Sequence, residues 1–204
     1  MRGKKPLSQH EVTSLRKLLE ENELHSLLLN IGVDTMLRGS DLLNLKTSDL
    51  VTESGKVKTE VRVRMMKTKK NTLLIPLSPN SIKVIKKHIV GNNPDDFVFR
   101  SSFSPFTKKP LSIFQYSRIV KKWMTMLGKE DVSEYSTHSI RKTKSSVIYQ
   151  KTQNVEIVRR LLCHSNSSAT VNYLGIEDSD ALDVARTINV QTLPPHTHIN
   201  THHN

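Results

Sequence analysis

The 204-residue sequence holds very little of several features that would define other classes of protein. Its one cysteine, Cys163, excludes an internal disulfide and fits a reducing compartment. No apolar run approaches the roughly 20 residues that span a bilayer, and the start of the chain, "MRGKKPLSQH", has no apolar signal core. A glycine-rich phosphate loop and a carboxylate cluster are also missing. We therefore expect a cytoplasmic protein that has no membrane partner and binds no cofactor or metal.

Acidic residues are scarce beside basic ones. The chain has 31 Lys and Arg against 19 Asp and Glu, which gives a formal net charge of +12 at pH 7. The basic residues are spread along the chain, and this favours a polyanionic partner, with nucleic acid as the first candidate. Apolar residues make up 36% of the sequence, which is enough for one hydrophobic core and hence one globular domain.

Hydrophobic periodicity predicts a mainly helical protein with one β-hairpin. Ser8 and Glu11 form the capping-box pattern at the start of the first helix. The hairpin is indicated by alternating apolar and charged residues at 57–66, a polar turn at 67–71 and an apolar run at 72–77. Helices are expected at about 9–22, 23–32, 39–45, 78–91, 112–128, 138–150, 154–163, 168–174 and 179–190, with a short strand at 97–99. In the helix at 112–128, the spacing predicts these core residues: Ile113, Phe114, Ile119, Val120, Trp123 and Leu127.

Two basic residues in the first half of the chain are candidates for chemistry. Arg38 lies in "MLRGSDLLNL" and Lys67 lies in "MMKTKKN". Taken singly, each has an ordinary explanation. Arg38 can pair with Asp41 at the surface, and a lysine in a polar turn is usually solvated.

The second half of the chain contributes four further candidates. His138 and Arg141 lie three positions apart in "THSIRKT", so both can face one target from the same side of a helix, although this spacing often arises by chance. His164 ends an amphipathic helix, where a histidine usually interacts with the helix dipole. Tyr173, nine positions later, also suits a core residue whose hydroxyl reaches the rim.

Four stretches, "MLRGSDLLNLKTSDL", "MMKTKKNTLLIPLS", "HSIRKT" and "LLCHSNSSATVNYLGI", occur in this order along the chain. Together they resemble the catalytic domain of the tyrosine recombinase (phage integrase) family over about residues 7–190. The first is similar to the family's first-arginine box, with an acidic residue three positions after the arginine. The second is similar to its hairpin and points to Lys67, over Lys69 or Lys70, as the catalytic lysine. The others resemble its H-x-x-R box and its Leu-Leu-Gly-His box with the nucleophilic tyrosine nine residues on, except that Cys163 replaces the usual glycine.

The resemblance implies that a DNA phosphodiester is transferred to Tyr173 without a metal. Attack by the phenol oxygen builds negative charge on two non-bridging oxygens. The guanidinium groups of Arg38 and Arg141 can meet both oxygens while keeping their own charge. His164 would add a hydrogen bond to the same oxygens.

Two further residues would move protons in this reaction. His138 would take the phenol proton, since a tyrosine with a pKa of about 10 is a weak nucleophile at neutral pH. Lys67 would protonate the leaving 5′ oxygen. The covalent 3′-phosphotyrosine conserves the bond energy, so the strands can be rejoined without ATP.

The resemblance also sets the expected fold, domains and partners. We expect an α+β, mainly α, tyrosine-recombinase catalytic-domain fold with a small antiparallel β-sheet over residues 1–190, followed by a disordered tail at 191–204. The expected partners are double-stranded DNA and further copies of the chain, assembled as a tetramer on paired DNA sites. The helix at 179–190 would dock on a neighbouring protomer. Such a protein would be bacterial or phage-encoded and associated with the nucleoid.

Three alternatives stay open. A relative that has lost catalysis would bind DNA only. A type IB topoisomerase shares the chemistry but differs in whether four protomers assemble. A metal-dependent nuclease would use the histidine-rich tail "HTHINTHHN", which lacks acidic partners.

Overall fold

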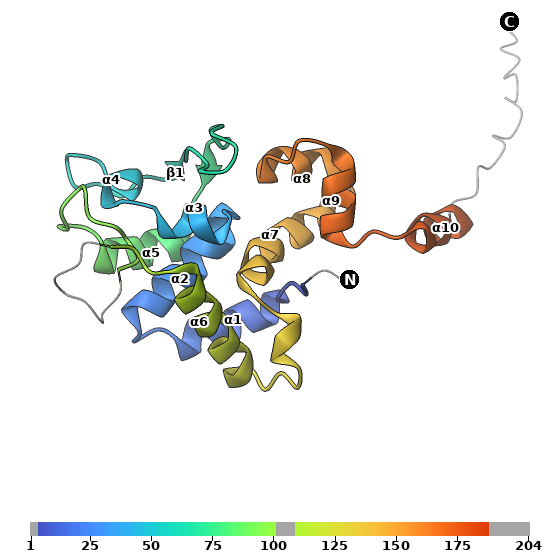
Figure 1. Ribbon diagram of the computed structural model, residues 1–204, viewed down its shortest axis with the longest axis horizontal. Helices are drawn as coiled ribbons and strands as arrows, with labels where there is room; N and C mark the ends of the chain where they lie inside the picture. Colours follow the sequence, from blue (N-terminus) through green and yellow to red (C-terminus); the bar gives the residue numbers. More distant parts are fainter. Residues whose placement is uncertain (1–3, 101–108, 188–204) are drawn as a thin grey trace, which may run out of the picture.

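The computed structural model describes residues 4–100 and 109–187, which form helices joined by short segments and one antiparallel pair of strands (Figure 1). No helix in this part of the chain is long and apolar enough to cross a membrane. In chain order the elements are α1 (Gln9–Leu18), α2 (Glu23–Thr35), α3 (Gly39–Leu43), α4 (Thr47–Leu50), β1 (Glu60–Val61), β2 (Ile75–Pro76), α5 (Pro79–His88), α6 (Ile113–Met126), the 3-10 helix η1 (Val132–Glu134), α7 (Thr137–Thr152), α8 (Val155–Leu162), α9 (Ser167–Leu174) and α10 (Asp178–Thr187).

The starts of the helices follow signals in the sequence. The capping box predicted for α1 is confirmed: the Glu11 amide donates to Ser8 Oγ at 3.2 Å, and the Ser8 amide donates to Glu11 Oε2 at 2.7 Å. Ser78 caps α5, and Pro79 occupies its first turn, where a missing N–H costs nothing. Local chemistry therefore decides where these helices begin.

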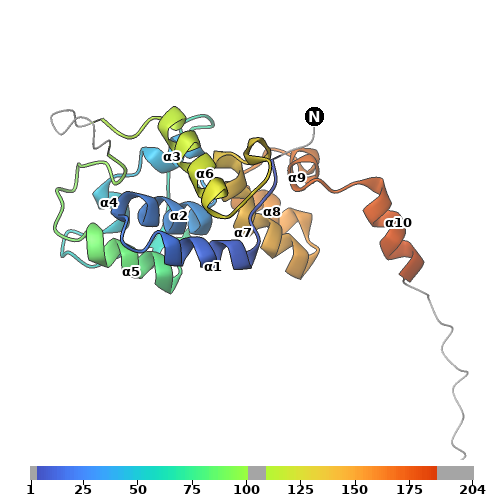
Figure 2. The same ribbon diagram turned by 90° about the horizontal axis from the view of Figure 1, so that it is seen from below.

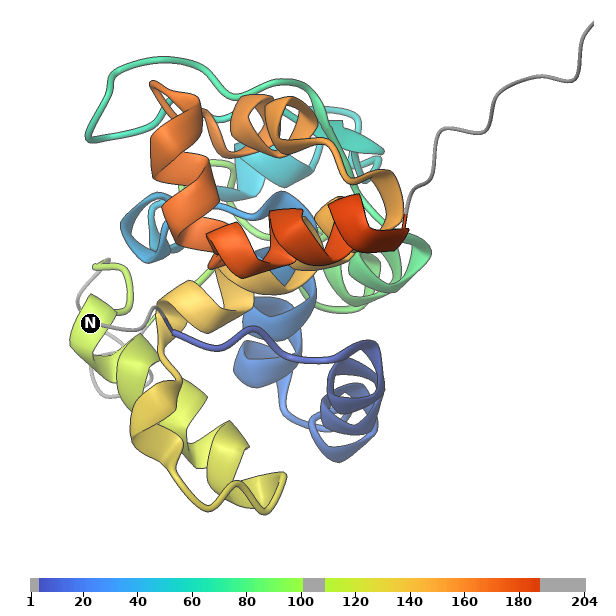
Figure 3. The ribbon, with the colours of Figure 1, turned by 90° about the vertical axis from the view of Figure 1, so that its right-hand side faces the viewer.

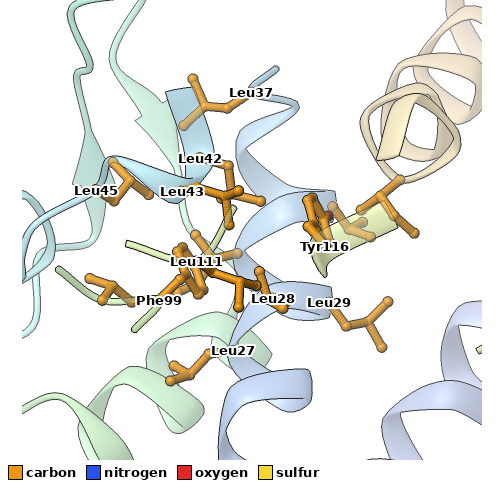
Figure 4. Close-up of a cluster of buried hydrophobic side chains, with 14 of the residues drawn as sticks. Leu27, Leu28, Leu29, Leu37, Leu42, Leu43, Leu45, Phe99, Leu111 and Tyr116 are labelled. Atoms are coloured by element: carbon orange, nitrogen blue, oxygen red, sulfur yellow. The ribbon is translucent and has the colours of Figure 1, made fainter. Parts of the chain in front are cut away.

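Helix α2 lies at the centre of the molecule. Every residue from Ser26 to Thr35 is buried, and the helix packs against α1, α5 and α7. Figure 4 shows its leucines gathered with Phe99, Leu111 and Tyr116 from distant parts of the chain. Burial of apolar area of this kind supplies most of the free energy of folding.

A buried polar network joins α2 to α5 and α7. Asp34 is 3% exposed, and its Oδ2 accepts hydrogen bonds from Ser81 Oγ at 2.5 Å and the Ser78 amide at 2.7 Å. Lys144 Nζ donates to the Asp34 carbonyl at 3.1 Å and lies 3.5 Å from Oδ1. A buried carboxylate is tolerated only when it is paired in this way. The network therefore fixes α7 against the core.

The predicted hairpin is present, but its regular ladder is short. Strands β1 and β2 pair with Glu60 opposite Pro76 and Val61 opposite Ile75. One isolated bridge, between Arg64 and Asn71, continues the pairing toward the turn. Along the first arm, buried side chains alternate with exposed ones as predicted from the period of two; the buried ones are Val61, Val63 and Met65.

Two expectations about the region around α6 were wrong. Ile113 and Phe114 are 50% and 69% exposed, whereas Val120 and Trp123 are fully buried. The first turn of α6 lies at the edge of the core, where Ile113 meets Gly39 of α3 and Phe114 lies beside Arg118, so the helical spacing is right but these two side chains stay largely exposed. The expected strand at 97–99 is reduced to isolated bridges, from Phe97 to Lys46 and from Arg100 to Pro110.

Helices α8 and α9 pack on the second half of α7 through a small separate cluster (Figures 1 and 3). Its buried members are Met36, Val158 and Leu162, and its partly buried members are Ile148, Tyr149, Leu161, Tyr173 and Leu174. Helix α10 extends beyond α9, away from the rest of the chain (Figures 1 and 2). The structure confirms a helix here as far as Thr187, while 188–190 and the predicted tail at 191–204 lie outside the described residues.

Helix α7 ends in a strained backbone conformation that offers a test of the fold. Gln153 caps the helix with φ 51° and ψ 22°, the left-handed region that glycine adopts most easily. Gln153→Gly should raise the free energy of unfolding by about 1 kcal/mol, because this conformation costs an L-residue roughly that amount. Urea denaturation followed by circular dichroism measures the change.

Gln153→Ala is the matched control for this experiment. Both variants lose the hydrogen bond from Gln153 Nε2 to the Gln150 carbonyl at 3.0 Å, but only alanine keeps a Cβ. If the alanine variant is as stable as the glycine variant, the left-handed backbone is not the source of the strain.

Candidate active site

Five of the six predicted site residues come from four separated segments. Arg38 is the N-cap of α3, His138 and Arg141 lie in the first turns of α7, His164 lies between α8 and α9, and Tyr173 lies in the last turn of α9. Arg141 and Arg38 act electrostatically on both histidines and on Tyr173, so these five side chains surround one place. The sixth predicted residue is described separately below.

Arg141 is held by two helix ends. It is 4% exposed, and its Nη1 donates a short hydrogen bond to the Met36 carbonyl while its Nη2 donates to the Leu162 carbonyl at 2.8 Å. Met36 caps α2 and Leu162 is the last residue of α8, so both carbonyls carry the negative end of a helix dipole. Burial lowers the pKa of Arg141, but a guanidinium remains charged at neutral pH.

Asp41 links Arg38 to the hairpin, a role that sequence reasoning missed. The alternative of a surface ion pair with Arg38 is not seen among the described residues; Asp41 is 2% exposed, and its Oδ1 accepts from the Met66 amide at 2.8 Å. Arg38 Nη1 contacts Met65 Sδ at 3.4 Å. These contacts hold the base of the turn that carries Lys67 next to Arg38. The only feature of the sequence that hinted at this role of Asp41 was its place three positions after the arginine.

Lys67, the sixth predicted residue, does not lie with the other five side chains of the site. It lies exposed in the hairpin turn, and its side chain makes no hydrogen bond or ion pair with another residue that the structure describes. Lys69, two positions later, has a left-handed backbone with φ 56°, and its amide closes the turn on the Met65 carbonyl at 2.9 Å. The structure thus places Lys67 next to the pinned residue Met66 and leaves its ammonium group in solvent.

His138 opens α7 at the surface of the site. Its amide donates to Ser136 Oγ at 3.2 Å, which completes the start of the helix. Desolvation lowers the pKa of His138, and the positive charges of Arg141, Arg38 and Lys4 lower it further. A neutral imidazole at this position can accept a proton at neutral pH.

His164 and Tyr173, the residues at the two ends of "HSNSSATVNY", are in contact. Their ring centroids lie 5.4 Å apart at 82°, an edge-to-face arrangement. His164 Nδ1 shares a hydrogen bond with Thr170 Oγ1 at 3.0 Å, which leaves Nε2 for another partner. Burial, together with Arg141 and Arg38, lowers the pKa of His164 to about 4.

The Tyr173 hydroxyl is buried close to Arg141 and Ser145, but it makes no hydrogen bond of normal geometry with another described residue. Burial raises the pKa of Tyr173 to about 12, although Arg141, Ser145 and Arg38 act in the opposite direction. Four other buried side-chain atoms in the described residues also lack a partner, so it is the position of the Tyr173 hydroxyl among positive charges that marks it as a place for a ligand. The surrounding charges show that an anion is the kind of ligand that would be favoured.

Cys163 departs from the usual glycine at a position where glycine has a physical advantage. It caps α8 with φ 53° and ψ 43°, in the left-handed region. The Cys163 and His164 amides donate to the Arg160 and Arg159 carbonyls at 3.1 and 3.0 Å, so the helix end is closed normally.

The described residues contain no group of three or more His, Cys, Asp and Glu side chains that could hold a metal ion. The histidine-rich tail lies outside them.

Comparison with known proteins identifies the family. The sequence matches the profile of the phage integrase family over residues 5–179. It is 30% identical over 161 residues to a probable integrase/recombinase, YoeC, of Bacillus subtilis (strain 168), with 79% of this chain and 82% of that protein covered. It is 33% identical over 189 residues to a tyrosine recombinase of Thermosipho africanus (strain TCF52B), with 88% of this chain and 60% of that protein covered.

Solved structures share the fold. The crystal structure of XerA recombinase aligns with a TM-score of 0.71 at 16% identity, covering 94% of this chain and 68% of that one. XerH recombinase, in its pre-cleavage complex with difH substrate, aligns with a TM-score of 0.66 at 16% identity, covering 91% of this chain and 55% of that one. The expected mainly α fold with a small antiparallel sheet is confirmed.

The chain therefore belongs to the phage integrase family, whose members named above are recombinases, enzymes that break and rejoin DNA. It spans about three fifths of the Thermosipho protein. These matches do not favour an inactive relative or a topoisomerase.

The lowered pKa of His164 predicts a pH dependence of stability. Between about pH 6.5 and pH 4, unfolding lets this histidine bind a proton that the folded site excludes, so stability falls as the pH falls through this window. His164→Gln should lose less stability than the parent chain when the pH is lowered from 7 to 5, as measured by urea denaturation. His25 and His138, whose pKa values are also lowered, are common to both proteins. Equal losses in the two proteins would contradict the burial of a neutral His164.

Proposed function

We propose that this chain cuts and rejoins double-stranded DNA at specific sites, with Tyr173 as the nucleophile and a covalent 3′-phosphotyrosine as the intermediate. The observation that carries the proposal is the buried Tyr173 hydroxyl, which makes no hydrogen bond of normal geometry with another described residue and lies among Arg141, Arg38 and His164. Membership of the phage integrase family supports the same reaction.

Arg38, Arg141 and His164 bind the phosphate under attack. Both arginines keep their charge, and together they can hold two non-bridging oxygens as negative charge develops there. His164 presents its free Nε2 to the same group, because its Nδ1 is occupied by Thr170. A bound phosphate would restore the proton affinity that the two arginines take from His164, since it adds a negative charge to a strongly positive site.

Proton transfer is assigned to His138 and Lys67. The Tyr173 phenol loses its proton to His138, and its oxygen forms a bond to phosphorus. The bond from phosphorus to the 5′ oxygen breaks, and that oxygen takes a proton from Lys67. For this step the hairpin turn must close on the DNA, because the Lys67 ammonium lies in solvent in the free chain. Rejoining is the same sequence in reverse.

The partners follow from charge and shape. A net charge of +12 favours a DNA duplex, and the XerH and Tn1549 integrase structures that resemble this chain are described as DNA complexes. We assign residues 1–190 to the catalytic domain, and we assign the protein to the nucleoid of a bacterial cytoplasm.

Helix α10 stands apart from the rest of the chain, which suits an element that docks on a second copy (Figure 2). The lambda integrase relative is described as a dimer on DNA, and we propose a tetramer on paired sites for this chain.

Tyr173→Phe tests the nucleophile. The substitution removes one oxygen and almost no surface, so it should abolish the covalent adduct on a nicked suicide duplex carrying the ends of the host element while duplex affinity stays the same. A denaturing gel detects the adduct. Tyr149→Phe is the matched control, because Tyr149 packs in the same small cluster and should remain active. An adduct formed by the Tyr173→Phe chain would mean that another residue attacks.

A substrate with a different leaving group distinguishes the proposed proton donor, Lys67, from the proposed phosphate-binding residue Arg38. A sulfur in place of the bridging 5′ oxygen leaves as a thiolate that needs no proton. On that substrate Lys67→Ala should recover most of its cleavage rate, whereas Arg38→Ala should stay slow, because charge on the non-bridging oxygens develops with either leaving group. Rescue of Lys69→Ala or Lys70→Ala instead would move the acid within the turn, and no rescue at all would assign Lys67 to phosphate contact only.

A further inference from the structure

Lys142, the residue after Arg141, is a buried lysine that the proposed reaction does not use. It is 7% exposed, and its ammonium makes no hydrogen bond or ion pair with any other described residue. The side chain is largely buried and borders the cavity described below, and a lysine charge in such a position is unfavourable unless something nearby stabilises it. Desolvation lowers the pKa of Lys142, as expected for such a position.

The Lys142 side chain meets the helix that carries the nucleophile at two points. Its Nζ lies over the Tyr173 ring, 5.8 Å from the ring centroid. The same atom is 4.0 Å from the position that a Cβ would take at Gly175, the left-handed residue that ends α9. Lys142 therefore lies against both the ring of Tyr173 and the end of its helix.

No carboxylate forms an ion pair with Lys142 among the residues that the structure describes. Its side chain lines a cavity of about 450 Å³ together with the N-terminal segment, η1 and the residues that follow α9. In this cavity Lys5 pairs with Glu134 at 2.6 Å, and Lys4 Nζ donates to the Ser133 carbonyl at 2.6 Å. The charged or titratable groups that face Tyr173 or Lys142 are Arg38, Arg141, His164, Lys4, Lys5, Glu134 and Glu177.

We infer that Lys142 is a positioning residue for the nucleophile: its ammonium holds the Tyr173 ring against His164 and favours the ionised phenol over the neutral one. The inference rests on the proposed function of Tyr173. An ammonium is attracted to the face of an aromatic ring, and the attraction is strong where water is excluded. It grows when the phenol loses its proton, because the phenolate spreads negative charge into the ring. Lys142 thus helps to offset the cost that burial imposes on ionising Tyr173.

The test compares the pH dependence of adduct formation in Lys142→Met and the parent chain. Methionine keeps an unbranched apolar side chain and removes the charge. Adduct formation by Lys142→Met should be about tenfold slower at neutral pH, and the rise of the rate with pH should move to higher pH by about one unit. Lys142→Arg, which retains a cation, should restore most of the parent profile. Lys151→Met, the same charge change at an exposed position of α7, should behave as the parent chain.

A second measurement reads Tyr173 without DNA. The phenolate absorbance of each chain, minus that of its Tyr173→Phe counterpart, follows the ionisation of Tyr173 alone. Its midpoint should lie higher in Lys142→Met than in the parent chain. An unmoved midpoint, or a slower reaction with an unchanged pH profile, would reduce Lys142 to a packing role and overturn the inference. An adduct formed by Tyr173→Phe would instead overturn the proposed function itself.

Discussion

The pair of hydrogen bonds from Arg141 to the carbonyls of Met36 and Leu162 is the interaction on which the site depends. It ties the end of the central helix α2 and the end of α8 to α7, so one guanidinium satisfies carbonyls that would otherwise be orphaned at two helix ends. The same group supplies the buried positive charge beside Tyr173. A substitution of Arg141 would therefore disturb the packing of two helix ends and remove the positive charge beside Tyr173 at the same time.

The positive charges around the site favour the binding of an anion. Burial favours the neutral forms of His164 and Tyr173: together with the two arginines it lowers the pKa of His164 to about 4, and against the pull of the same arginines it raises the pKa of Tyr173 to about 12. The site without a ligand therefore disfavours both the protonated form of His164 and the ionised form of Tyr173. In the proposed reaction, a bound phosphodiester adds negative charge beside the two arginines. Substrate binding would therefore also change the proton affinities of His164 and Tyr173.

Much of the fold and site was predictable from the sequence, for identifiable reasons. The capping box at Ser8 and the alternation along 57–66 are local signals, and local signals decide where elements start and which face is buried. Ile113 and Phe114 were misjudged because the periodicity of α6 tells which side faces inward but not how far the core extends along the helix. The expected strand at 97–99 failed because its neighbours, Lys46 and Pro110, each pair with only one residue.

The residues that sequence reasoning missed depend on tertiary contacts. Asp41 acquires its role from the Met66 amide, 25 positions away, which no local pattern connects to it. Lys142 lies against Tyr173 and Gly175 of α9 and its end, although a lysine beside an arginine usually indicates a solvated face. The first half of α7 buries mostly polar residues, so hydrophobic periodicity carries little information there.

The division of the apolar residues into a large core around α2 and a small cluster under α8 and α9 has a consequence for motion. Few buried side chains secure the smaller unit, so opening it exposes far less apolar surface than unfolding the whole chain. Its backbone amides are therefore expected to exchange with solvent through local openings that leave the main core closed. Tyr173 belongs to this smaller cluster, so the proposed nucleophile can move together with α8 and α9 while the core around α2 stays packed.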